Sequence, residues 1–460
     1  MKRLSALILL LLPLACTPRL YPPEVDLPDR YLHDAGYSAA SGDIPDRWWR
    51  LFGDTTLNRL VERALENNRD LAAAASSIEE ARASLGAVRA QYLPQIGVDV
   101  SAGADYTAAT KIVQSYAVEP TLSWEVPLFG ALRHASEAAR AQLAASEWAY
   151  AGVRLSLAAE VATTYFTLLE YERDLAIARS SYDLRRESAA LIDSMFRYGM
   201  SDGVALDQAR SLVYSAAADI PLYRRAVEQA RLSLSTLLGE PQRLSGNYGS
   251  GERLVLDTHP TDIPVGLPSE LLVRRPDVMQ SRAEVREAAA NAGTARSARF
   301  PAIALTAKGG VAAASLKGLT AANPWAWEAA GSLVEPIFAF GRLRRREQAA
   351  IARYDQAARN YEQTVLTALA DVEKALVAIE TYRTEALHYG ELVAANGRIA
   401  EMTQALFRSG FSDYLDVIDA QRSLYASQMQ LVNLLAQQHI NYVNLFKALG
   451  GGWSPEGTYK

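Results

Sequence analysis

The sequence contains little of what enzymes and metal proteins usually depend on. Its 460 residues include one cysteine and five scattered histidines. His388 and Glu391 lie three residues apart, but no second pair of metal ligands accompanies them. No nucleophile motif and no phosphate-binding loop is present. These absences argue against a helical hydrolase or metalloenzyme, and we expect no catalytic residue, no metal site and no cofactor.

Three further absences limit the partners and the architecture that the sequence allows. The formal net charge is −5, so the basic face that nucleic-acid binding needs is not expected. After the first 15 residues, no run of eighteen apolar residues occurs, so the sequence predicts no transmembrane helix. Proline is missing from residues 130–220 and from residues 337–454, which leaves room for very long helices.

The N-terminus has the pattern of a targeting segment. Lys2 and Arg3 precede an apolar stretch over residues 4–14, and Ala15 stands just before Cys16. This pattern resembles a bacterial lipoprotein cleavage site, although Pro13 replaces the usual leucine. We expect residues 1–15 to be a signal peptide and residues 16–55 to be an N-terminal extension lipidated at Cys16. An ordinary signal peptide that leaves a free thiol is the alternative.

Most of the remaining chain forms an internal sequence repeat. Short segments recur at offsets of 207 to 211 residues: Asn68-Arg69-Asp70 with Arg275-Pro276-Asp277, Leu93-Pro94 with Phe300-Pro301, Gly199-Met200-Ser201-Asp202 with Gly410-Phe411-Ser412-Asp413, and Leu237-Leu238-Gly239 with Ala448-Leu449-Gly450. Such a constant offset predicts two copies of one structural unit. We place the repeats at residues 56–239 and 269–452, with a Pro/Gly-rich linker at 240–268 and a tail at 453–460.

Each repeat has the same predicted plan. A first helix, over residues 56–92 or 269–299, is followed by two strands bounded by prolines and then by long helical runs. An uninterrupted helix over residues 131–196 would reach roughly 100 Å. Pro221 is expected to kink the returning helix of the first repeat.

The strands show the clearest periodicity of the chain. Over residues 95–106, apolar side chains alternate strictly with polar or small ones, and the pattern returns near residues 115–128, 301–312 and 325–337. Glu335 falls where the apolar face of the fourth strand should continue, so we expect a bulge or the point where the strand leaves the barrel there. Strands of about ten residues with one apolar face are typical of membrane β-barrels. A soluble hairpin packed on a core is the alternative.

Four strands cannot close a barrel, and an open sheet edge in lipid leaves backbone groups unsatisfied. Two copies of the chain would supply eight strands around a filled interior, and three copies would supply twelve around a lumen. The second face consists of small side chains and carboxylates, which suit water. This composition favours three copies.

Three features of the chain resemble those of a known family. The closing segment over residues 444–453 (NLFKALGGGW), the run from Leu415 to Arg422 and the repeat itself are similar to TolC-type outer-membrane factors, in the lipoprotein branch that serves resistance-nodulation-division multidrug efflux pumps. The resemblance implies an α+β membrane protein that forms a homotrimer. Each chain would give four strands to a twelve-stranded barrel in outer-membrane lipid and long helices to a periplasmic α-barrel. The implied partners are a periplasmic adaptor and an inner-membrane pump.

The glycine turns are expected at the end of the helical tube. Gly199 and Gly410 supply the backbone freedom of a tight reversal, and Ser201 or Ser412 can cap the helix that follows. In the family these tips meet the adaptor. The resemblance therefore implies adaptor contacts for six residues: Phe196, Gly199, Ser201, Phe407, Gly410 and Ser412. Turns that serve only to cap helices are the alternative.

A possible gate follows the second turn. Asp416, Asp419 and Arg422 are spaced three apart and share one helix face, with Leu415 beside them. In the family, the matching positions line the constriction that closes the resting channel. The first repeat has Ala205 and Gln208 in place of the two aspartates. The gate is thus expected mainly from the second repeat, and an ordinary solvated helix face is the alternative.

The leading hypothesis is the outer-membrane channel of a tripartite efflux system, which passively exports drugs or other small molecules. An exit duct of a type I protein-secretion system has the same architecture and is the runner-up. The lipoprotein signal and the Ala-Leu-Gly-Gly-Gly-Trp ending favour efflux. A soluble helical scaffold is a third possibility, against which the alternating strands argue.

Overall fold

The computed structural model describes residues 20–33, 44–107, 111–241, 266, 268–321 and 323–452. The expected signal peptide, Cys16, most of the linker and the tail from Trp453 lie outside these residues. The chain forms two compact units. Unit 1 combines Ala75–Ala149 and Met279–Thr364 with the N-terminal residues to Val25, and unit 2 combines Asp26–Ala74, Tyr150–Val278 and Val365–Lys460.

The first helix of each repeat is broken, whereas the sequence suggested continuous helices. In the first repeat, the 3₁₀ helix η2 (Trp48–Phe52) precedes α2 (Thr55–Asn67) and α3 (Arg69–Ala90). In the second repeat, η4 (Pro268–Glu270) and α6 (Leu271–Arg274) precede α7 (Pro276–Ser297). Asn68 and Arg275 are the extended residues at the two breaks, with ψ of 133° and 123°. Pro276 explains the second break, because a proline disfavours helical backbone at the residue before it.

Both breaks are closed in the same way within unit 2. The Asn68 side chain donates from Nδ2 to the carbonyl of Leu237 (2.9 Å), and Arg275 donates from Nη1 to the carbonyl of Ala448 (3.2 Å). Leu237 and Ala448 are the last residues of the returning helices in their repeats. A side chain at Gly239 or Gly450 would collide with the backbone of the residue before the break, Asn67 or Arg274. The two repeats therefore share individual contacts as well as the same order of helices.

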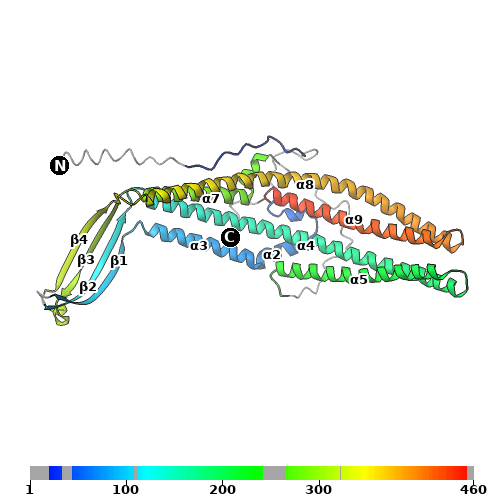
Figure 1. Ribbon diagram of the computed structural model, residues 1–460, viewed down its shortest axis with the longest axis horizontal. Helices are drawn as coiled ribbons and strands as arrows, with labels where there is room; N and C mark the ends of the chain where they lie inside the picture. The colour runs from blue at the N-terminus through cyan, green and yellow to red at the C-terminus, as the bar shows by residue number, and fades with distance from the viewer. Residues whose placement is uncertain are drawn as a thin grey trace. The chain divides into compact units, whose positions relative to one another are not determined.

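The long helices match in length between the repeats. α4 (Ala131–Arg197) and α8 (Arg342–Arg408) each contain 67 residues. The returning helices α5 (Gly203–Leu237) and α9 (Tyr414–Ala448) each contain 35 residues, and α5 continues through Pro221. In unit 2, α5 lies beside α4 and α9 lies beside α8 (Figure 1). No helix in the described part of the chain has the length and hydropathy that a transmembrane helix requires.

Unit 1 contains one antiparallel sheet, in which β1 (Gln95–Thr107), β2 (Lys111–Val126), β3 (Ala302–Ala313) and β4 (Trp325–Val334) lie in that order (Figure 1). A short 3₁₀ helix, η5 (Leu316–Thr320), lies between β3 and β4 in the chain. β2 and β3 pair across the two repeats, so both repeats build a single sheet. β4 ends at Val334, directly before Glu335, whereas the sequence predicted a strand to about residue 337.

The core of unit 2 is centred on aromatic rings. Trp48 stacks on Phe446 with ring centroids 5.2 Å apart, and the buried ring of His439 lies 4.8 Å from that of Phe166. His439 Nδ1 is 2.8 Å from the carbonyl of Leu435, one turn back on α9. This histidine is therefore a core residue of the helical unit.

The glycines that follow α9 are required by close packing. Gly450, Gly451 and Gly452 have φ values of 89°, 59° and 60°, a region that favours glycine. A side chain at Gly452 would meet the carbonyl oxygens of Ile44 and Pro45, and one at Gly451 would meet Leu155. The glycine run thus lets residues 450–452 pack closely against the segment that leads into η2.

Candidate functional site

The two helix–helix turns of unit 2 have the same backbone geometry. The amide of Gly199 donates to the carbonyl of Phe196 (3.0 Å), and Met200 donates to Met195 (2.8 Å). In the second repeat, Gly410 donates to Phe407 (3.0 Å) and Phe411 donates to Leu406 (2.9 Å). This pair of bonds is the Schellman motif, which needs a left-handed residue. Gly199 and Gly410 provide it, with φ of 71° and 78°.

The helices after the turns are capped by aspartates, and the expectation that Ser201 or Ser412 caps them was wrong. Asp202 accepts from the amide of Ala205 (2.8 Å), and Asp413 accepts from the amide of Tyr414 (2.7 Å). The hydroxyl of Ser412 instead donates to the carboxylate of Asp416 (2.7 Å). Each serine lies one residue before the N-cap position, which Asp202 and Asp413 occupy.

The residues predicted for adaptor contact do not share one environment. Phe196 and the two turn glycines are exposed. Ser201 and Ser412 are half-buried, and the Phe407 ring packs 5.5 Å from that of Tyr414. Phe407 therefore belongs partly to the small core beneath the turns, which is formed by Ile192, Leu206, Ala209, Leu212, Tyr414, Val417 and Ile418.

The four residues predicted for the gate lie on the exposed face of α9. Leu415, Asp416, Asp419 and Arg422 are all exposed, and Leu415 keeps 51% of its surface. The intervening Val417, Ile418 and Gln421 are buried against the rest of unit 2, and Gln421 donates to the hydroxyl of Ser188 (3.2 Å). α9 therefore presents a carboxylate-rich stripe away from its own core. In the first repeat, Ala205 packs against the core instead.

A three-helix contact that the sequence did not reveal lies one turn beyond Arg422. The hydroxyl of Tyr425 on α9 donates to Asp219 on α5 (2.9 Å). The guanidinium of Arg185 on α4 lies over the Tyr425 ring, 5.1 Å from its centroid. Burial lowers the pKa of Arg185, and burial together with the bond to Asp219 raises the pKa of Tyr425. The contact joins the helices of both repeats directly behind the predicted gate.

A buried acidic pair lies farther along α4. Glu170 and Asp174, one helical turn apart, are 8% and 6% exposed. Asn433 of α9 donates to Glu170 (2.9 Å), whereas one buried oxygen of Asp174 has no hydrogen-bond partner in the structure. Burial, reinforced by Glu170, raises the pKa of Asp174 to about 8. One of these carboxyl groups therefore holds a proton at neutral pH. The i,i+4 spacing of two acids was the signal available in the sequence.

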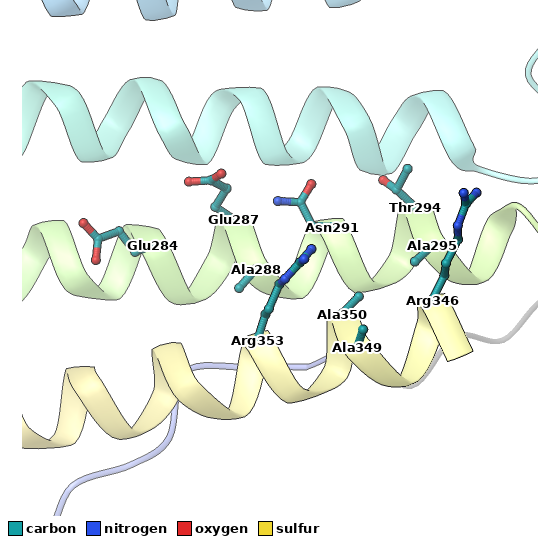
Figure 2. A pocket seen from close by; sticks show the side chains of 10 residues that line it. All are labelled: Glu284, Glu287, Ala288, Asn291, Thr294, Ala295, Arg346, Ala349, Ala350 and Arg353. Atoms are coloured by element: carbon teal, nitrogen blue, oxygen red, sulfur yellow. The ribbon is translucent and has the colours of Figure 1, made fainter. Parts of the chain in front are cut away.

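Unit 1 has a groove of about 800 Å³ between α7 and α8 (Figure 2). Glu284, Glu287 and Asn291 line it from α7, and Arg346 and Arg353 line it from α8. Burial, and then the neighbouring Glu284, raise the pKa of Glu287. The lining contains two acids and two arginines, so the groove carries no net charge that would select an ionic ligand. Within the described residues, no group of three or more His, Cys, Asp or Glu side chains is arranged to hold a metal ion.

The comparisons with known proteins agree with one another. The sequence matches the family described as "Outer membrane efflux protein" over residues 60–240 and 267–451. It is 32% identical over 444 residues to the probable outer membrane lipoprotein SilC of Salmonella typhimurium, covering 95% of each chain. It is 35% identical over 410 residues to the toluene efflux pump outer membrane protein TtgI of Pseudomonas putida, covering 88% of this chain and 87% of TtgI.

A solved structure extends the agreement to the fold. The crystal structure of the Campylobacter jejuni CmeC outer membrane channel superposes with a TM-score of 0.87 over 96% of each chain, at 25% identity. The match spans both repeats, the sheet and the long helices. The chain therefore belongs to the outer membrane efflux protein family.

Proposed function

We propose that three copies of this chain form a passive duct that carries drugs or other small molecules out through the outer membrane. The observation that carries the proposal is the sheet. β1 and β4 are its edges, and Ile96, Val98 and Trp327 expose 78%, 64% and 83% of their surface on one face. Open edges and an exposed apolar face are stable in lipid only when the sheet closes into a barrel. Twelve strands leave a lumen, whereas eight would be filled.

The helices of unit 2 support the same assembly. Large apolar side chains stay exposed along α5 and α8, among them Tyr214 (69%), Leu387 (53%) and Met402 (61%). Rows of exposed apolar residues on long helices are typical of surfaces that another chain covers. Neighbouring copies of α5 and α8 would bury these rows in a closed ring of helices.

The exposed stripe of α9 would then face the axis of the ring. Three copies of Asp416 and Asp419 make a narrow ring that attracts cations, and Arg422 can bridge neighbouring chains. The turns at Gly199 and Gly410 would contact the periplasmic adaptor, which links the duct to an inner-membrane pump. Cys16 would carry the lipid that anchors the chain to the outer membrane.

The efflux duct is favoured over a protein-secretion duct. TtgI is named for a toluene efflux pump, and the family is described by efflux. The pump, rather than the duct, would choose the substrates.

Fractionation and electrical recording test the proposal together. The protein should appear in the outer-membrane fraction and migrate as a trimer until it is heated. Purified trimers should form channels in planar bilayers, and Cys16→Ser should abolish lipid labelling without abolishing the channels. A soluble monomer, or a trimer that never conducts, would exclude the duct.

A further inference from the structure

The register of the sheet places its charges on one face and most of its large apolar side chains on the other, although Val113 and Val334 share the charged face. Every charged strand residue with a described side chain falls on one face: Asp99, Asp105, Glu119, Glu125, Lys308 and Glu328. The opposite face of β1 carries Ile96, Val98 and Val100. If the sheet closes as proposed above, lipid takes the apolar face, and all of these charges line the lumen.

Four of the charges form a row across the sheet, which we call the strand charge row: Asp99 (β1), Glu119 (β2), Lys308 (β3) and Glu328 (β4). Asp99 is directly opposite Glu119, and Lys308 is directly opposite Glu328. Lys308 Nζ lies 3.1 Å from the Glu328 carboxylate and 4.0 Å from that of Glu119. The row thus holds one lysine and three carboxylates, and the lysine forms ion pairs with two of them.

The middle of the row depends on a glycine. A side chain at Gly310 would collide with the backbone of β2 at Val118 and Glu119. Because Gly310 has no side chain, the β2 backbone can approach it closely, and Lys308 can approach Glu119 diagonally. The backbone therefore places the only cation of the row between two acidic strands.

The strand charge row contains a repulsive pair of carboxylates that lowers the stability of the sheet. Two carboxylates directly opposite each other on neighbouring strands destabilise a sheet. Asp99 and Glu119 are such a pair, and the Glu119 side chain is only 16% exposed. A neutral pair at these positions would hold the same register with less repulsion. The arrangement is therefore suited to a task other than stability.

We propose that the strand charge row is a second charge filter of the duct, separate from Asp416 and Asp419, and that it favours inorganic cations and cationic cargo within the barrel. The inference rests on the proposed function, because the row lines a pore only in a closed barrel. In three copies, nine carboxylates would face three lysines. Lys308 limits the negative potential, and the carboxylates create it.

Reversal potentials in a KCl gradient test this filter with the full-length trimer in planar bilayers. Lys308→Gln should shift the reversal potential toward greater cation preference, and the double variant Asp99→Asn/Glu119→Gln should shift it in the opposite direction. The exchange Lys308→Glu/Glu328→Lys keeps both the ion pair and the net charge, so it should restore the wild-type value. The shifts should be large near 0.1 M salt and fade near 1 M, where the screening length falls from about 10 Å to about 3 Å.

Asp105→Asn is the matched control, because it removes one charge from the same face of β1 outside the row. The charge-filter proposal is overturned if Lys308→Gln leaves the reversal potential unchanged. It is also overturned if Asp105→Asn shifts the reversal potential as much as the single variant Asp99→Asn does. The shifts should persist in an Asp416→Asn/Asp419→Asn background, and their loss there would assign the selectivity to the gate alone. A wild-type trimer that never conducts would instead overturn the duct itself, and the filter with it.

Discussion

Asn68 and Arg275 occupy the same position in the two repeats, and each donates a hydrogen bond to the last carbonyl of the returning helix in its own repeat. The two residues differ in their other partners. Asn68 Oδ1 accepts from the amides of Asp70 (2.9 Å) and Leu71 (3.1 Å) and so caps α3. Arg275 forms ion pairs with Asp277 (2.6 Å) and Asp371 (3.2 Å). One site of the repeat is therefore built with a neutral cap and the other with a buried cation.

This difference predicts unequal costs of substitution. Asn68→Ala removes a cap and should lower the free energy of unfolding by about 1 to 2 kcal/mol. Arg275→Ala removes a donor from two carboxylates and two carbonyls, so the loss should be at least about 2 kcal/mol. Denaturant unfolding of the purified protein measures both losses.

Arg274→Ala is the matched control for the arginine. Arg274 pairs with Glu270 at 2.9 Å in a more exposed place, so its removal should cost no more than about 1 kcal/mol. An equal loss for Arg274→Ala and Arg275→Ala would contradict a special role for the break.

The gate prediction concerns the exposed stripe of α9. Replacement of Asp416 and Asp419 by alanine should raise single-channel conductance and weaken cation preference, because it removes six carboxylates from the narrow ring of a trimer. Single-channel recording in planar bilayers measures both changes. Asp207→Ala on α5, whose side chain is 81% exposed, is the control and should leave conductance unchanged. Unchanged conductance in the double variant would remove the two aspartates from the gate.

The caps at the turns predict a local loss of stability. Asp413→Ala should destabilise the start of α9 by about 1 kcal/mol, because the amide of Tyr414 loses its acceptor. Ser412→Ala should stay within about 0.5 kcal/mol, since its hydroxyl donates only to exposed acceptors, the Asp416 carboxylate and the carbonyl of Asp413. Hydrogen exchange of the first amides of α9 reports the difference. Faster exchange in Ser412→Ala than in Asp413→Ala would show that the serine is the cap after all.

The buried acidic pair predicts a pH dependence of stability. The folded chain raises the pKa of Asp174 from 3.8 to about 8, so it keeps a proton that the unfolded chain has released. This contribution to stability is complete below the ordinary pKa and is lost as the pH rises toward 8. The slope for one proton is at most about 1.4 kcal/mol per pH unit.

Asp174→Asn should remove that slope, so the variant should gain stability over the wild type between pH 5 and pH 8. Thermal unfolding at several pH values measures the difference. Asp183→Asn, at an exposed position of the same helix, should follow the wild-type pH profile. If Asp174→Asn also follows it, the proton is not held by this pair.

The sequence predicted the sheet and the repeat well because both depend on periodic patterns. Alternation of side chains located β1 to β4 within a few residues, and the two proline-free stretches contain all of α4 and α8. The break at Asn68 was missed because an asparagine in an alanine-rich helix looks like any polar surface residue. Its role appears only when the carbonyl of Leu237 is brought beside it.

The candidate site was predicted only in part for a related reason. Helical spacing placed Asp416, Asp419 and Arg422 on one face, and the structure exposes that face. The Tyr425–Asp219 hydrogen bond joins residues that lie 206 positions apart, and no local sequence pattern predicts it. The burial of Asp174 likewise depends on which side of α4 meets α9. Local spacing can therefore assign residues to a face, but it cannot identify what that face meets.

The matched lengths of the helix pairs restrict how this protein can change in evolution. The turns of the two repeats share one small core, in which Ile192 and Leu206 meet Tyr414 and Val417. A one-heptad deletion in α4 alone would withdraw its turn from that core and leave the other turn unsupported. Insertions and deletions should therefore persist in homologous genes only as compensated pairs, separated by about 211 codons.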